Sequence, residues 1–221
     1  FCLFLQVFYY IFTIELRLLM FTLLTIMIIK RSKLEKGSNY FILAIGLLTC
    51  IEIGSWLGNH YSKNYNSTIL YVIGVNLIGF FLFFLYFHQM LKSEKLKRIN
   101  LILIILFLAN YLFFALTDGD FFKFFPFFSY FVEVVLLVSS IYLVMSQAFN
   151  SDRILNLVGY FPFWVCISSL IIYLGVMPLL IISITAENMM NINIFYIIMF
   201  FVNFIGYSIL LFGIIKVKNT I

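Results

Sequence analysis

Four ionisable residues stand inside long apolar stretches of the sequence, where charged side chains are rare. A charged group at membrane depth costs about 2.5–3.5 kcal/mol on insertion scales, so it usually faces the interior of a helical bundle and has a partner there. Acids in such positions often carry protons or contact ligands. The first candidates for chemistry in this chain are therefore Glu15, Arg17, Glu52 and Glu133.

The three acids are predicted to lie at a similar depth. At 1.5 Å per residue, Glu15 and Glu52 stand roughly 18–22 Å from the basic ends of their apolar stretches. Glu133 stands roughly 14 Å from the opposite end of its own stretch. All three then fall in one layer in the outer half of a bilayer, and the amides of Asn76 and Asn203 add neutral hydrogen-bonding groups to it.

Helical spacing suggests partners within this polar layer. Glu15 and Arg17 are two residues apart and point about 200° away from each other, so they cannot pair on one helix face. We therefore expect Arg17 to meet Glu52 or Glu133 across the bundle. Glu133 is the principal candidate, because serines and a tyrosine share its helix face and its own stretch has no basic residue. We expect it to carry a proton at pH 7.

Two interpretations of the polar layer stay open. In the first, these groups are structural, and a buried ion pair with hydrogen bonds fixes how the helices pack. In the second, they line a cavity for a ligand, a substrate or a proton. Three carboxylates against one guanidinium leave an imbalance that packing alone does not require, which favours a functional role.

The composition places these residues in a membrane protein. Of the 221 residues, 64% are hydrophobic and only 10% are charged, against roughly 45–50% and about 25% in soluble domains. Backbone groups in lipid must be satisfied internally, which leaves a helical bundle or a closed barrel. The stretches 101–108 and 134–138 are apolar without alternation, so the predicted fold is all-α: a polytopic transmembrane helical bundle.

About seven apolar runs are long enough to span a bilayer, given roughly 20 residues per crossing. No polar domain or linker remains between them, so residues 1–221 are predicted to form a single transmembrane domain. The predicted spans are residues 7–29, 40–58, 69–91, 99–117, 124–149, 159–183 and 192–215.

The basic residues orient this bundle. Eleven of the fourteen lie in the breaks after spans one, three, five and seven, and positively charged loops stay in the cytoplasm. The amino terminus is therefore predicted outside and the carboxyl terminus inside. Topogenesis and anionic headgroups account for the net charge of +5 without nucleic acid. The inner residues are Lys30, Arg31, Lys33, Lys36, Lys92, Lys95, Lys97, Arg98, Arg153, Lys216 and Lys218, and the outer ones are Lys63 and Lys123.

Enzymatic and cofactor chemistry find no support in the motifs. The cysteines at 2, 50 and 166 lie far apart in the sequence and form no CxxC or similar motif. Neither a disulfide framework nor a zinc site is therefore indicated. His60 and His88 fall at opposite membrane faces and cannot ligate one haem together. No HExxH, GxSxG or P-loop pattern occurs. We predict a protein that is not an enzyme and that has no cofactor and no metal.

The run from Ser129 to Tyr142, SYFVEVVLLVSSIY, together with Glu52 in span two, resembles a group of small seven-helix bacterial membrane proteins without an established activity. The similarity extends over nearly the whole length of the chain. Some members of that group carry an acid where this chain has Asn76. The resemblance implies a multi-pass protein of the bacterial inner (plasma) membrane.

Three functions fit these features. The leading hypothesis is a non-enzymatic sensor or accessory protein, whose polar layer binds a small ligand and whose basic loops meet a cytoplasmic or membrane protein partner. The second is a small secondary transporter or proton-coupled carrier that uses Glu52 and Glu133. The third is a structural subunit of a larger membrane complex.

The predicted topology can be tested by cysteine labelling. In a variant without the three native cysteines, a cysteine placed beside Lys63 should react with a membrane-impermeant reagent in intact spheroplasts. One placed beside Lys95 should react only after lysis, because it is expected in the cytoplasm. Labelling of both positions, or of the second alone, would contradict the seven-span arrangement.

Overall fold

The computed structural model describes residues 2–35, 37–62, 65–151, 157–185 and 192–217, which form helices and connecting turns without any strand. Lys36, Lys63, Arg153 and Lys218, four of the residues used to orient the chain, lie outside the described residues. The helices are α1 (Cys2–Ile29), α2 (Ser38–Tyr61), the π-helical η2 (Leu70–Gly79) running into α3 (Phe80–Met90), α4 (Glu94–Thr117), α5 (Phe127–Phe149), α6 (Phe161–Thr185) and α7 (Ile192–Lys216), with a short 3-10 turn η1 (Arg31–Lys33) after α1.

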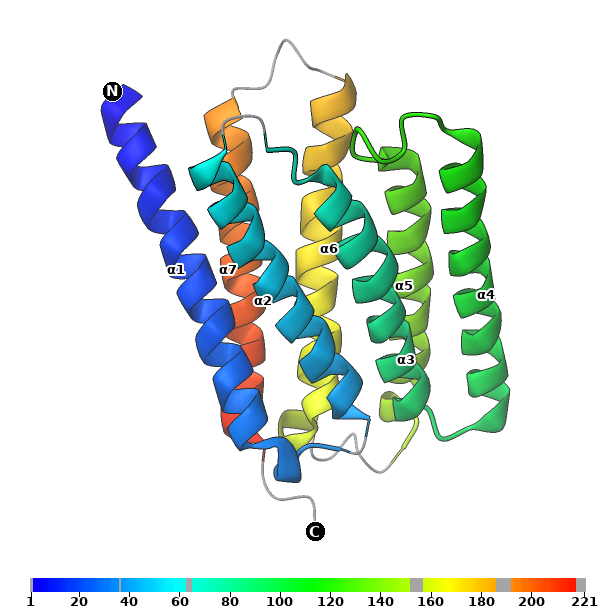
Figure 1. The fold of residues 1–221 in the computed structure, drawn as a ribbon. Helices are drawn as coiled ribbons and strands as arrows, with labels where there is room; N and C mark the ends of the chain where they lie inside the picture. The colour runs from blue at the N-terminus through cyan, green and yellow to red at the C-terminus, as the bar shows by residue number, and fades with distance from the viewer. Residues whose placement is uncertain (1, 36, 63–64, 152–156, 186–191, 218–221) are drawn as a thin grey trace.

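The helices run up and down beside one another, and α1 begins at the opposite end of the bundle from the end of α7 (Figure 1). We call the two ends the Tyr61 end and the Lys30 end. Among the described residues, six helices are long and apolar enough to cross a membrane: α2, η2 with α3, α4, α5, α6 and α7. The all-helical fold with seven helices is confirmed within the described residues. The number of crossings and their orientation stay predictions.

Several helix ends differ from the predicted spans by up to five residues, and two of these differences have simple reasons. Helix α4 begins at Glu94, five residues before the predicted boundary, because its first turn is charged rather than apolar. Glu94 accepts a hydrogen bond from Lys97 at 3.0 Å. A negative charge in the first turn also interacts favourably with the positive end of the helix dipole. Helix α5 begins only at Phe127, since Pro126 at its N-cap cannot donate to a preceding turn.

The π-helical segment η2 is the largest departure from expectation, because the sequence predicts a regular α-helix over span three. Its backbone lies close to α2: a Cβ added at Gly74 would come within 2.3 Å of Ile51 Cδ1. A Cβ at Gly79 would lie 3.2 Å from the carbonyl oxygen of Gly74. The two glycines therefore permit both the wider turn and the close contact. Such π turns frequently accompany functional sites.

A core of aromatic rings holds the middle of the bundle together. Phe80 of α3 packs against Phe107 of α4, Tyr130 of α5 and Tyr173 of α6, with ring centroids 6.3, 5.7 and 5.1 Å away. Aromatic pairs in this range add about 0.5–1.5 kcal/mol beyond their area burial. One residue thus ties four helices together at a single level.

At the Lys30 end, two polar side chains fasten helix ends to each other. Lys30 Nζ, just after α1, donates to the carbonyl oxygens of Ile214 and Ile215 at 3.0 and 3.4 Å. These belong to the last turn of α7, whose carbonyls have no partner within the helix. The ends of α1 and α7 are therefore joined.

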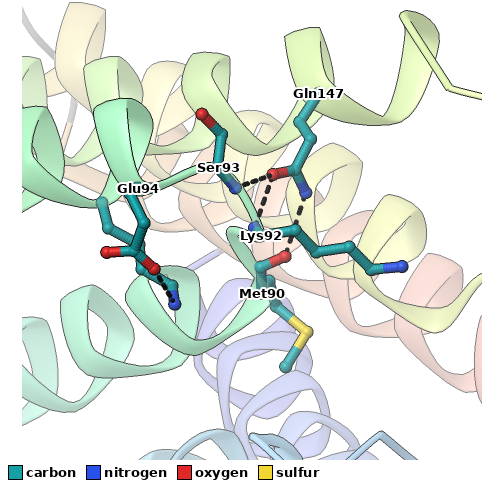
Figure 2. Close-up of polar contacts among 6 residues, drawn as sticks. Met90, Lys92, Ser93, Glu94 and Gln147 are labelled. Carbon is teal, nitrogen blue, oxygen red and sulfur yellow. Dashed lines mark hydrogen bonds and ion pairs between the residues drawn. The ribbon is translucent and has the colours of Figure 1, made fainter.

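Gln147 of α5 makes the second connection, through hydrogen bonds to the turn between α3 and α4 (Figure 2). Its Oε1 accepts from the backbone N–H groups of Lys92 and Ser93 at 2.6 and 3.3 Å. Its Nε2 donates to the carbonyl oxygen of Met90 at 3.1 Å. One amide therefore satisfies both the last turn of α3 and the chain that leads into α4.

Replacing Gln147 by alanine should destabilise the fold. The change removes three hydrogen bonds at a half-buried turn, and we expect a loss of about 1–2 kcal/mol in the free energy of unfolding. Thermal unfolding in detergent measures it. The matched control is Gln89→Ala, an exposed glutamine at the same end of the bundle, which should leave the unfolding temperature nearly unchanged. Equal effects of the two substitutions would show that the hydrogen bonds of Gln147 do not stabilise the fold.

Candidate functional site

Glu133 lies in the interior of the bundle on α5, with 0% of its surface exposed. The hydroxyl of Ser129, one turn earlier, donates to Glu133 Oε1 at 2.8 Å. Asn110 of α4 donates in turn to the hydroxyl and to the carbonyl oxygen of Ser129, at 3.0 and 3.2 Å. The second carboxyl oxygen, Oε2, is buried and has no hydrogen-bond partner in the described part of the chain.

Asn76 of η2 is the second buried polar group at this level. It is 1% exposed, and neither its amide nitrogen nor its oxygen has a partner among the described residues. Nearby in the chain, the carbonyl oxygen of Val72 accepts a hydrogen bond from the hydroxyl of Tyr111 of α4 at 3.3 Å, and Phe80 packs on Tyr130 of α5. No hydrogen bond joins the side chain of Asn76 to Glu133 within the described residues.

We call Glu133, Ser129 and Asn110 the Glu133 cluster, since hydrogen bonds join them. Ser140, the second serine that helical spacing places on this face of α5, belongs to a separate contact, where it donates to Asn100 of α4. Helical spacing explains the cluster on α5, because residues four apart lie on one face. The contribution from α4 comes from packing.

Glu52 forms a second cluster on α2. It is half-buried, and its Oε1 accepts a hydrogen bond from the hydroxyl of Tyr71 in η2 at 2.9 Å. Ser55, three residues after Glu52 on α2, is buried. From α7, the buried Tyr207 lies within electrostatic reach of both Glu52 and Tyr71. The Glu52 cluster therefore joins α2, η2 and α7.

Arg17 does not form the predicted ion pair. Its guanidinium carbon lies 5.6 Å from the ring centroid of Trp56, and its Nε is buried without a hydrogen-bond partner in the described structure. The ion pairs within the described residues are Lys97–Glu94 and Lys123–Asp120, both between exposed loop or helix-end residues. The reason is geometric: the face of Trp56 holds the cation, and Tyr71 holds the carboxylate of Glu52. Arg17 and Trp56 complete the Glu52 cluster.

Two other predicted members lie apart from both clusters. Glu15 is exposed on the outer side of α1, as expected for a residue about 200° from Arg17 around the helix. Asn203 donates to the carbonyl oxygen of Met199 in its own helix at 2.8 Å, so this bond joins it to no other helix. The predicted single layer is therefore two clusters, and no hydrogen bond among the described residues joins Glu15, Asn76 or Asn203 to either of them.

Buried tyrosines lie between the two clusters. Tyr130, three residues before Glu133, is within electrostatic reach of Glu133 and of Tyr207 on α7. Tyr207 in turn reaches Glu52, and Tyr173 of α6 interacts with both tyrosines. Buried tyrosines from α5, α6 and α7 are thus the polar neighbours of the two clusters.

Trp56, Tyr71 and Tyr173 were not predicted from the sequence. Trp56 stands four residues after Glu52, so helical spacing alone could have placed it on the same face. Tyr71 carried no comparable signal, because its contact depends on how η2 packs against α2. Tyr173 likewise lies in a uniformly apolar helix.

No group of three or more His, Cys, Asp or Glu residues that could hold a metal occurs within the described residues. Comparison with protein-family models, with curated proteins and with solved structures finds no match to this chain. The function has to be inferred from the geometry of the two clusters.

Ser129→Ala should destabilise the protein because Ser129 connects Asn110 to Glu133. We expect a loss of about 1–3 kcal/mol in the free energy of unfolding, the cost of leaving buried polar groups unsatisfied. Ser139→Ala is the matched control on the same helix, since Ser139 bonds only to the carbonyl oxygen of Val135 one turn earlier in the described structure. That control should change stability by less than about 0.5 kcal/mol. Unfolding in detergent measures both, and a neutral Ser129→Ala would show that the connection contributes nothing.

Proposed function

We propose that this protein is a non-enzymatic sensor or accessory protein of the bacterial inner membrane, with seven spans, an outer amino terminus and a cytoplasmic carboxyl terminus. In this proposal, the polar region between α2 and α5 takes up a proton or a small ligand. The resulting change reaches the cytoplasmic ends of the helices, where basic loops meet a partner protein.

The burial of Glu133 is the observation that carries this proposal. Packing an apolar bundle requires no acid, and an ionised carboxylate without a cation is very costly in an apolar interior. Within the described residues, the titratable groups that interact with Glu133 are Tyr111 of α4 and Tyr130 of α5, and neither supplies a positive charge. Glu133 is therefore suited to hold a proton and to change the charge of the core when it releases it.

The contacts at the Lys30 end support transmission from this region to the loops. Gln147 lies on the same helix as Glu133 and holds the chain between α3 and α4. A shift of α5 would move that connection, which carries basic residues on the predicted cytoplasmic side. The route needs only helix displacement, a common form of switching.

A proton-coupled carrier is the second candidate, and the tyrosines between Glu133 and Glu52 favour it. Acids, histidines and tyrosines in a row are the usual elements of proton paths in membrane proteins. Flux measured in proteoliposomes separates this function from sensing: a carrier variant with Glu133→Gln should lose proton-driven uptake, whereas a sensor shows no uptake at all.

Glu133→Gln should insert and fold but lose its response. The amide keeps the size of the side chain and the hydrogen bond from Ser129, so we expect stability within about 1 kcal/mol of wild type. Spin labels at Ser32 and Lys95, two exposed positions at the Lys30 end, measure the separation of helix ends in nanodiscs. Wild type should change this separation when the pH is raised above neutral, because Glu133 then releases its proton, and Glu133→Gln should not.

Glu15→Gln is the matched control, because it removes an exposed acid on α1 and should respond like wild type. Infrared spectra add a direct check: the carbonyl band of a protonated carboxyl at neutral pH should disappear in Glu133→Gln. A variant that responds like wild type would remove Glu133 from the site. Absence of any response, together with stoichiometric co-purified proteins, would instead favour a structural subunit of a larger complex.

A further inference from the structure

The Glu52 cluster holds two opposite charges near each other without pairing them. Glu52 of α2 accepts a hydrogen bond from the hydroxyl of Tyr71, and the guanidinium of Arg17 of α1 lies over Trp56, four residues after Glu52 on α2. Within the described residues, however, no ion pair joins the guanidinium to the carboxylate. Oppositely charged groups in an apolar setting normally pair with each other, so these separate contacts call for an explanation.

The contact with Trp56 does not use the hydrogen-bonding edge of Arg17. A cation–π contact uses the flat face of the guanidinium or its charge, whereas its five N–H donors lie in the plane and match a carboxylate or phosphate. Arg17 Nε is buried and has no partner among the described residues. Trp56 is itself held on α2 by His60, which stacks on it at 5.9 Å with an interplanar angle of 19°.

Glu52 offers the complementary charge one helical turn away from Trp56. Tyr71 donates to its Oε1 at 2.9 Å, which fixes the orientation of the carboxylate. Glu52, Trp56 and Tyr71 are all half-buried, and Ser55 is buried beneath them. The cluster therefore combines an aromatic ring, a cation whose Nε has no partner among the described residues, and a half-buried carboxylate. Trp56 lies five residues, or roughly 8 Å, from the Tyr61 end of α2.

We propose that this cluster binds a small zwitterion, with Arg17 contacting its oxyanion and Glu52 its ammonium group. Two sources share this chemistry: a free amino acid, or the phosphate and amine of an ethanolamine lipid headgroup. The assignment depends on the proposed sensor function for its biological role, but the binding itself does not require a response of Glu133.

Fluorescence of Trp56 tests the proposal in the full chain. The sequence has two tryptophans, so Trp164→Phe leaves Trp56 as the single reporter. In nanodiscs of phosphatidylglycerol alone, the common free L-amino acids are added one at a time. In a second arm, phosphatidylethanolamine is included and no amino acid is added. We expect a saturable change in emission in one arm, and that arm identifies the source.

Single substitutions then assign the two charges. Arg17→Gln and Glu52→Gln should each weaken binding by about tenfold or more, the effect of losing a charge-assisted hydrogen bond. Glu15→Gln, two residues from Arg17 on the exposed side of α1, should bind like wild type. Tyr71→Phe keeps the ring but releases Glu52 and should weaken binding several-fold, which provides a test if either charge variant fails to fold.

The proposal is overturned if neither arm changes the emission of wild type, or if the Arg17 and Glu52 variants bind as tightly as wild type. Glu133→Gln should keep full binding in this assay. A response lost in Glu133→Gln with binding retained leaves both proposals standing. Binding absent in wild type while the Glu133-dependent response persists would remove the zwitterion site alone.

Discussion

In hydrocarbon there is no water to hydrogen-bond with polar groups, so the polar groups of this bundle need partners within the protein. A backbone or side-chain group taken into hydrocarbon without a partner costs several kcal/mol, so the chain forms helices throughout its membrane-crossing segments and places its serines and asparagines against other polar atoms. Ser129, Asn110 and Ser140 follow this rule, since each finds a partner on its own or a neighbouring helix. The exceptions among the described residues are Oε2 of Glu133, both amide atoms of Asn76, Nε of Arg17, Nδ1 of His88 and the hydroxyls of Ser38 and Tyr86. Glu133 and Arg17 are the two in which a charge would be left in the interior.

The aromatic core explains how such exceptions are tolerated. Phe80 contacts rings from three other helices, and this contact sits one turn from Asn76. A tightly packed core resists rearrangement, so the unsatisfied groups cannot simply rotate toward the bundle surface. The π-helical turns of η2 lie directly beside this region and set which side chains of span three face inward.

The sequence was sufficient for the helices and for the face of Glu133, because both depend on local periodicity. Apolar runs located all seven helices to within a few residues, and i, i+4 spacing placed Ser129 beside Glu133. The contacts between helices could not be predicted from the sequence. Whether Arg17 meets a carboxylate or Trp56 depends on the rotation of α1 and α2 about their axes, and each residue changes the direction of a side chain by about 100°. The π-helical segment also shifted the register of span three, which no periodic pattern revealed.

The bond from Lys30 to the last carbonyls of α7 has a mechanical consequence. Helix α1 is a rod of 28 residues, about 42 Å long, that carries Arg17 near its midpoint and is pinned to α7 at one end. Such a rod pivots about its pinned end, so a small sideways pull at Arg17 becomes a tilt of the whole helix and a torque on the final turn of α7. Helices α1 and α7 would then move together.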